Sequence, residues 1–233
     1  MLLDAALDLL LGGCCVGCER PGRALCAACS AQLPPVGRPA WPTPAPPGLV
    51  PPWAADEYAG TVRAMVLAHK ERAVLSLGGP LARLLASAVV AAEVPGPLVL
   101  VPVPSRPSTV RARGHDPTRA MTARAARLVG ATAVPLLRTR PGLADQAGLD
   151  AAQRAANLAG SLHCPSAGLR RLARRHPTAR VVVCDDVLTT GATAREAQRA
   201  LESVGLRVAA VAAVAVTRRN WPRAALSSSP GTV

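Results

Sequence analysis

The feature that most constrains this 233-residue chain is a stretch where an apolar run meets two carboxylates and a Thr/Gly loop. Residues 181–184 (VVVC) have the length and composition of a buried strand, and Asp185 and Asp186 follow at once. The loop 189–191 (TTG) then leads into residues 192–204, whose apolar positions recur at helical spacing. Because α/β sheets bind ligands beyond the carboxyl ends of their strands, this order predicts a ligand site here.

The chemistry of the loop favours a phosphorylated sugar. A helix N-terminus directs backbone N–H groups and the positive end of its dipole at an anion. Thr189, Thr190 and Thr193 add hydroxyl donors, Gly191 permits close approach of the backbone to a phosphate, and Ala192 opens the helix. Carboxylates accept hydrogen bonds from a sugar diol, so the whole indicates a ribose 5-phosphate. The alternative is a capped helix start with no ligand.

Other apolar runs fit the same architecture. Residues 98–103 and 207–216 read as strands and 134–137 as a weak one, and three segments show helical spacing: 61–69, 80–90 and 117–129. Strands alternating with helices predict an α/β fold with a parallel sheet flanked by helices. Half of the residues are apolar but only 2% are aromatic, so the core must consist of Ala, Val and Leu.

Four of the seven cysteines form two Cys-x-x-Cys pairs, Cys15/Cys18 and Cys26/Cys29, separated by seven residues. This spacing is typical of a tetrahedral structural Zn²⁺ site with four protein ligands. Two disulfides, or reduced thiols in a small core, are the alternatives. Cys14 could replace Cys15, although this would lengthen the first spacing.

We expect four regions along the chain. Residues 1–33 hold a short amphipathic helix (1–11) and the four-cysteine unit, and residues 34–52, with nine prolines, form a stiff linker. Residues 53–220 form the α/β domain, and 221–233 a disordered tail. Residues 1–11 contain two aspartates and no cation, unlike a secretory signal, and no segment is apolar enough to cross a membrane. We therefore expect a cytoplasmic protein without membrane insertion.

The net charge of +13 favours a polyanionic partner. Of the 27 cations, 26 are arginine and one, Lys70, is lysine. A compositional bias toward Arg, Ala, Gly and Pro would explain the same excess. The densest cluster is Arg170, Arg171, Arg174, Arg175 and Arg180, and it is the best argument for a surface that faces DNA.

Residues 185–193 (DDVLTTGAT) resemble the phosphoribosyl pyrophosphate (PRPP) motif of type I phosphoribosyltransferases. The chain is similar to the ComF family of competence-associated proteins, which has this fold behind N-terminal zinc-binding cysteines. The similarity rests on the order of the segments 58–63, 69–70, 101–104, 111–115, 146–149 and 154–158. It departs at His115-Asp116, where relatives usually carry Phe-Asn, and in having fewer N-terminal cysteines, so we expect one zinc.

The resemblance implies roles for individual residues. It implies that residues 189–193 bind the 5-phosphate, and that Asp185 and Asp186 bind the ribose hydroxyls and contact Mg²⁺ through water. Pro102 and Val103, with Arg111 and Arg113, would hold pyrophosphate, although a strand terminator and a solvated face are the alternatives. Residues 139–160 match a mobile catalytic loop, in which Gln146, Arg154 and Asn157 follow the family pattern; an ordinary solvated helix is the alternative. The implied catalytic residues are Asp185, Asp186, Arg113 and Arg154.

Three functional hypotheses follow. The first is a phosphoribosyltransferase that uses Mg²⁺ and PRPP, releases pyrophosphate and acts on an acceptor that the sequence does not identify. The second is a non-catalytic protein of the same fold that serves DNA uptake through single-stranded DNA or competence-machinery partners. The third, a zinc-finger DNA-binding regulator, is disfavoured because only Arg20 and Arg23 lie between Cys15 and Cys29. The sequence does not indicate an oligomeric state.

Overall fold

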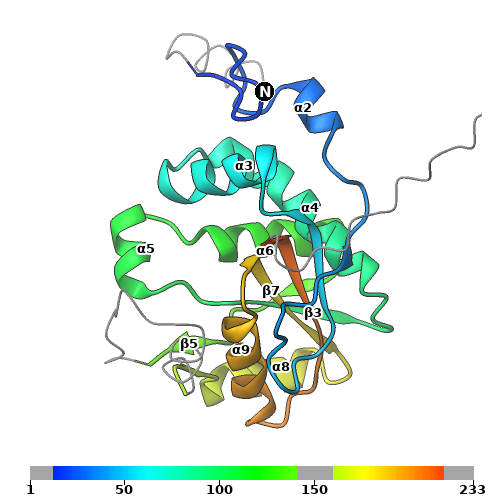
Figure 1. Ribbon diagram of the computed structural model, residues 1–233. Helices are drawn as coiled ribbons and strands as arrows, with labels where there is room; N and C mark the ends of the chain where they lie inside the picture. The colour runs from blue at the N-terminus through cyan, green and yellow to red at the C-terminus, as the bar shows by residue number, and fades with distance from the viewer. Residues whose placement is uncertain (1–12, 141–159, 218–233) are drawn as a thin grey trace, which may run out of the picture.

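A computed structural model describes residues 13–140 and 160–217, in which helices and strands alternate along the chain (Figure 1). The helices are α2 (Ala27–Ala31), α3 (Gly60–Glu71), η1 (Leu75–Leu77), α4 (Gly78–Ala91), α5 (Pro107–Arg113), α6 (Pro117–Leu128), α8 (Ser166–Arg175) and α9 (Ala192–Glu202). The strands are β1 (Arg38–Pro39), β2 (Pro52–Glu57), β3 (Leu98–Pro102), β4 (Thr132–Ala133), β5 (Arg138–Thr139), β6 (Leu162–His163), β7 (Arg180–Leu188) and β8 (Val208–Val216).

The main sheet has the strand order β1-β2-β8-β7-β3-β4. All neighbouring strands in it run parallel except β1, which pairs antiparallel with β2 at the edge. After β3 the chain pairs β4 on one side of that strand and later returns to pair β7 on the other side. The predicted α/β class with a mostly parallel sheet is therefore confirmed.

Helices cover both faces of this sheet, with α3, α4 and α6 on one face and α8 and α9 on the other (Figure 1). Alternation along β7 divides its side chains between the layers, because successive strand residues point to opposite faces. Val182 and Cys184 pack under α4 and α6, whereas Val181 and Val183 pack toward α9.

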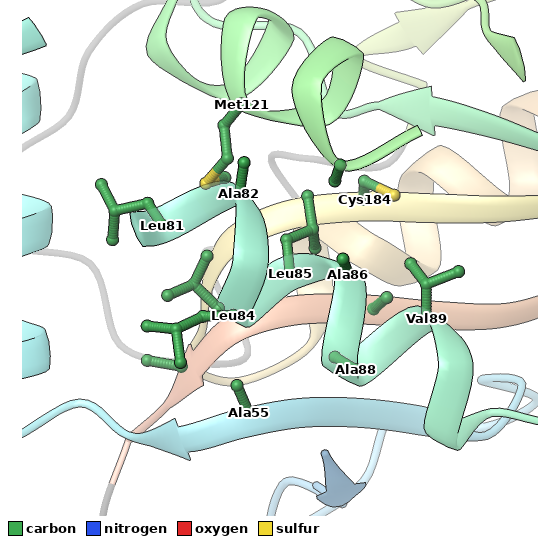
Figure 2. Packing of buried hydrophobic residues seen from close by; sticks show 14 of the residues in the cluster. Ala55, Leu81, Ala82, Leu84, Leu85, Ala86, Ala88, Val89, Met121 and Cys184 are labelled. Carbon is green, nitrogen blue, oxygen red and sulfur yellow. The ribbon is translucent and has the colours of Figure 1, made fainter. Parts of the chain in front are cut away.

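The core contains the small aliphatic residues expected from the composition. Figure 2 shows α4 laid across the strands, with Leu81, Leu85 and Val89 packed between Met121 of α6 and Ala55 of β2. In the described part of the chain the buried apolar side chains are Ala, Val, Leu, Met and Cys, with a few prolines such as Pro102 and Pro117. Alanines at the contacts let helix and sheet approach closely, which compensates for the lack of large aromatic side chains.

Two strand predictions need correction. The run 134–137 is not a strand; the short strand β4 lies two residues earlier, at Thr132–Ala133, where its backbone can pair with β3. Strand β7 does not end before the carboxylates but continues to Leu188. The reason is its neighbour β8, which is apolar throughout and pairs with β7 as far as Leu188↔Val216.

The proline-rich segment 34–52 is packed onto the domain and does not behave as a free spacer. Gly37 lies so close to α4 that a Cβ there would stand 2.6 Å from Ala88 Cα. Farther on, the Pro47 carbonyl accepts a hydrogen bond from Arg195 Nε (2.9 Å), and Gln198 Oε1 accepts one from the Val50 N–H (3.0 Å). The segment thereby joins α4, the edge of the sheet and α9.

Within residues 13–140 and 160–217, no helix combines the length and apolar character that a membrane crossing requires. The helix predicted at 1–11 and the tail predicted at 221–233 lie outside the described residues.

Candidate functional site

The candidate site lies where the strand order reverses. Strand β3 has β4 on one side and β7 on the other, so the chain leaves the carboxyl end of β3 and that of β7 in opposite directions. In open α/β sheets such a switch point creates a crevice in which ligands bind. The topology thus brings together the two segments that the sequence singled out, the end of β3 with Pro102 and Val103 and the end of β7 with the acidic pair. The Val103 N–H donates to the Cys184 carbonyl (2.8 Å) and joins them directly.

Asp185 and Asp186 are neighbours on β7 and therefore point to opposite faces of the sheet. Asp186 faces α3 and α6, where Lys70 Nζ lies 2.6 Å from its Oδ2 and Thr118 Oγ1 donates to the same oxygen over 3.5 Å. Asp185 uses Oδ1 to accept the Asp186 N–H (2.8 Å). The two carboxylates thus stand in different surroundings although they adjoin in sequence.

Electrostatics separates the two carboxyl groups further. Burial, and then the nearby charge of Asp186, raise the pKa of Asp185 from 3.8 to about 8. The Asp186 carboxylate in turn raises the pKa of Lys70 against the opposing effect of burial. At neutral pH the site therefore holds a protonated Asp185 beside a closed Lys70–Asp186 ion pair.

The loop after β7 has the backbone geometry of an anion site. Gly191 lies in the left-handed region (φ +75°) and precedes the first residue of α9, which has no side-chain N-cap. Thr190 Oγ1 accepts a long hydrogen bond of 3.4 Å from the Ala192 N–H, Thr189 is exposed, and Thr193 is partly buried. The next N–H groups of α9, those of Thr193 and Ala194, have no side-chain cap and are available to a ligand.

Gly191 also has a structural role that sequence reasoning missed. A Cβ at this position would lie 2.9 Å from Pro42 Cγ and 3.2 Å from Leu49 Cδ2. The glycine is therefore needed both for its backbone conformation and for the close passage of the proline-rich segment.

The predicted pyrophosphate-binding arginines lie on α5, beyond the end of β3. Arg111 is exposed, whereas Arg113 Nη2 forms a 2.6 Å ion pair with Glu71 at the end of α3. His115 follows, and its ring meets that of the buried His69 edge-on with centroids 5.7 Å apart. Its buried Nε2 has no hydrogen-bond partner among the described residues.

Asp116 has a local structural role. Its Oδ1 accepts the Arg119 N–H (3.0 Å) and the Ser105 hydroxyl (3.2 Å), which caps α6. The predicted catalytic Arg154, with Gln146 and Asn157, lies outside the described residues. The residues just before and after the segment 141–159 pair with each other as strands β5 and β6, in which Arg138 lies opposite His163.

Lys70 is the residue of this site to which sequence reasoning gave no role. It belonged only to a segment that matches the family pattern, yet in the structure its Nζ forms a 2.6 Å ion pair with Asp186 Oδ2. The available signal was its uniqueness, since it is the single lysine among 27 cations.

The four predicted cysteines converge at the other end of α3. The Sγ atoms of Cys15, Cys18, Cys26 and Cys29 lie within 4.8 Å of one another, and Cys14 is not among them. Cys18 Sγ and Cys26 Sγ are 3.6 Å apart, close to the about 3.8 Å between ligands of a tetrahedral ion with bonds of about 2.3 Å. Four thiols in this arrangement could bind a metal such as zinc.

The surroundings of this four-cysteine cluster affect its thiols differently: the pKa of Cys26 is lowered, chiefly by a hydrogen bond from the Cys29 backbone, whereas the hydrogen bond with Cys26 raises the pKa of Cys29 to about 12. Burial opposes ionisation of Cys15, but hydrogen bonds from the backbone of Cys26, Gly17 and Cys18 outweigh it and lower the pKa of its thiol to about 6. The cluster packs on the first turn of α3, where a Cβ at Gly17 would meet Thr61 Oγ1 at 2.9 Å.

Comparison with models of known protein families gives no match for this chain, and comparison with curated proteins gives none either.

Proposed function

We propose that this chain is a ComF-like protein of the type I phosphoribosyltransferase fold, which binds PRPP with Mg²⁺ and transfers ribose 5-phosphate to an acceptor. The observation that carries the proposal is the meeting, at the switch point of the sheet, of the acidic pair on β7, the uncapped start of α9 and the end of β3. The stretch 185–193, which resembles the PRPP motif, lies at this switch point.

In this proposal each face of β7 receives a different part of the donor. The N–H groups at the start of α9, with Thr189, Thr190 and Thr193, bind the 5-phosphate. Asp185 and Asp186 accept hydrogen bonds from the ribose hydroxyls. Pro102 and Val103 line the pyrophosphate side, with Arg111 and Arg113 as the cations that stabilise its growing negative charge. Carboxylates and water are the ligands that Mg²⁺ prefers, so the acidic pair fits the ion, which would add charge stabilisation at the leaving group.

The protonation of Asp185 gives this binding a pH dependence. A sugar hydroxyl donates best to an ionised carboxylate, and Asp185 is protonated below a pKa of about 8 in the free protein. Donor binding with Mg²⁺ should therefore release a proton near pH 7 and strengthen as the pH rises toward 8.

Isothermal titration calorimetry of PRPP, with and without Mg²⁺, tests the proposal. Asp186→Asn should weaken binding tenfold or more, because hydrogen bonds to charged groups contribute about 1.5–3 kcal/mol. Glu202→Gln, at the far end of α9 from the loop, is the matched control and should bind as the wild type does. Absence of PRPP binding by the wild-type protein would refute the proposal.

We propose a structural Zn²⁺ for the four-cysteine cluster. All four ligand positions are occupied by protein thiols, so the ion would have no open position for substrate.

A second candidate function, nucleic-acid binding in DNA uptake, is favoured by one specific observation. Helix α8 carries Arg170, Arg171, Arg174 and Arg175, all exposed, and the described residues offer them no acidic partner within salt-bridge distance. Leu172 of this helix is buried in the core, so α8 is fixed on the domain while its arginines stay exposed. An exposed row of unpaired arginines of this kind is suited to contacts with the phosphates of a nucleic acid.

Fluorescence anisotropy with labelled single-stranded DNA at several salt concentrations tests this alternative. Replacing Arg171 and Arg174 by Ala should weaken binding and reduce its salt dependence by about two phosphate contacts. Arg20→Ala/Arg23→Ala is the control pair. Equal DNA binding by both pairs of variants would exclude α8 as the binding surface.

A further inference from the structure

Lys70 stands apart among the cations of this protein. It is the single lysine, and its Nζ lies 2.6 Å from Asp186 Oδ2, inside the candidate site. The side chains of Lys70 and Asp186 are 28% and 12% exposed, so the pair is largely withdrawn from solvent. Removing one partner of a largely desolvated ion pair costs more free energy than breaking a pair on the surface, because the remaining charge is left without water or a counter-charge.

The surroundings of the pair are mostly apolar. A small cavity next to it is lined by Val66, Leu81, Pro117 and Met121, together with His69. Of the neighbouring titratable groups, the Asp185 carboxyl group favours the charged ammonium when it is ionised, and Arg113 disfavours it. A flexible four-carbon stem with a compact ammonium group suits this narrow setting better than the planar fork of an arginine.

The ion pair has a consequence for ligand binding. In the free protein the ammonium group of Lys70 balances the charge of the Asp186 carboxylate. A sugar hydroxyl that needs Asp186 as acceptor must compete with the ammonium group. Once that hydroxyl or a hydrated Mg²⁺ takes over the carboxylate, the ammonium loses its partner and must find another anion, because an unpaired buried charge is costly.

The sheet separates the two anionic ends of the donor. The loop that would bind the 5-phosphate opens α9, on the face of β7 away from α3, whereas Lys70 is on α3. The anion nearest the released ammonium is therefore the pyrophosphate. Arg113 lies on the same side, held by Glu71, the residue after Lys70.

We propose that Lys70 is a donor-binding residue that exchanges partners: its ammonium group neutralises Asp186 in the free protein and moves to the pyrophosphate of the donor when the ribose hydroxyls occupy that carboxylate. This inference rests on the proposed function. It predicts a contact that ribose 5-phosphate, which lacks pyrophosphate, cannot make.

The single lysine permits a direct observation of the exchange. Reductive methylation with ¹³C-formaldehyde keeps the charge and labels only Lys70 and the α-amino group, which serves as an internal reference. At fixed pH, the Lys70 resonance should move on addition of PRPP with Mg²⁺ or of pyrophosphate with Mg²⁺. It should move much less with ribose 5-phosphate, and the reference should stay in place.

Calorimetry on variants supplies the second readout. Lys70→Met should weaken PRPP binding at least tenfold and ribose 5-phosphate binding less than threefold, and Lys70→Arg should restore part of the PRPP affinity because it keeps the charge. Thermal melts establish that both variants are folded.

The outcomes separate this inference from the proposed function. If the wild type binds PRPP but the Lys70 resonance stays in place, or if Lys70→Met weakens both ligands equally, the exchange is refuted while the proposed function stands. Failure of the wild type to bind PRPP refutes the proposed function and the exchange together.

Discussion

Asp185 should destabilise the free protein at neutral pH, and Asp185→Asn should therefore stabilise it. The pKa of this carboxyl group is raised from 3.8 to about 8, chiefly by burial and then by Asp186. The folded state thus binds a proton that the unfolded state has released. Each pH unit of this difference is worth about 1.4 kcal/mol, so the roughly three units between pKa 3.8 and pH 7 set an upper limit of about 4 kcal/mol.

Asparagine keeps the oxygen that accepts the Asp186 N–H and removes only the ionisable group. Because burying an amide still has a cost, we expect a gain of about 2 kcal/mol at pH 7, or about 5 °C in Tm. The direction of the pKa shift of Asp185 determines how the stability of the protein depends on pH. A raised carboxyl pKa gives stability that is present below pH 3.8 and lost as the pH rises to about 8. The advantage of the variant should therefore grow between pH 4 and 8 and then level off.

Urea denaturation of the two proteins at a series of pH values, in Mg²⁺-free buffer, measures this difference. Asp186→Asn is the matched control: it breaks the ion pair with Lys70 and should be destabilising by about 1–3 kcal/mol. The reasoning is refuted if Asp185→Asn is less stable than the wild type at pH 7, or if its advantage is independent of pH between 5 and 8.

Two further predictions concern the cysteines and Gly191. Metal analysis should find one zinc per chain, which Cys29→Ser should lose and the control Cys14→Ser should keep. Removing the zinc should lower the Tm, because the four-cysteine cluster packs on α3. Zinc retention by Cys29→Ser would contradict this prediction. Gly191→Ala should cost about 2–4 kcal/mol, from the left-handed backbone and the contact with Pro42, whereas Gly130→Ala, with a φ of +66° and open space, should cost about 1–2 kcal/mol. If urea denaturation shows equal losses of unfolding free energy in the two variants, the proline-rich segment moves aside without an energetic cost and the prediction is wrong.

Central elements of the fold could be predicted because their own residues determine them. Strands β3, β7 and β8 are continuous apolar runs, and α4 and α6 carry apolar positions at helical spacing. Strand β2 was missed because it begins at a proline and ends in Asp56 and Glu57, so no apolar run marks it. Its conformation comes from pairing with β8, which is far away in sequence and invisible to any local pattern.

Helix α8 was missed for a related reason. Its sequence shows a run of arginines, which the composition of the whole chain makes unremarkable, and Leu172 is its only buried residue. Its docking on the sheet, through few apolar side chains, gives the helix its place. Because arginines are so frequent in the sequence, the ion pair between Arg113 and Glu71 could not be predicted: no local pattern distinguishes Arg113 from the other arginines as the partner of Glu71.

The acidic pair shows what local reading gets right and where it stops. Residue types and spacing were sufficient to place a candidate ligand site at Asp185 and Asp186 and to expect a helix N-terminus beside it. The strand was expected to end before them, which would have left both carboxylates free in one loop. Pairing with β8 instead extends β7 through them and turns the two side chains to opposite faces. Two neighbouring aspartates thereby become chemically different, because burial raises the pKa of Asp185 whereas Asp186 is paired with Lys70. In the proposed function, this difference provides one side for the 5-phosphate and another for the pyrophosphate.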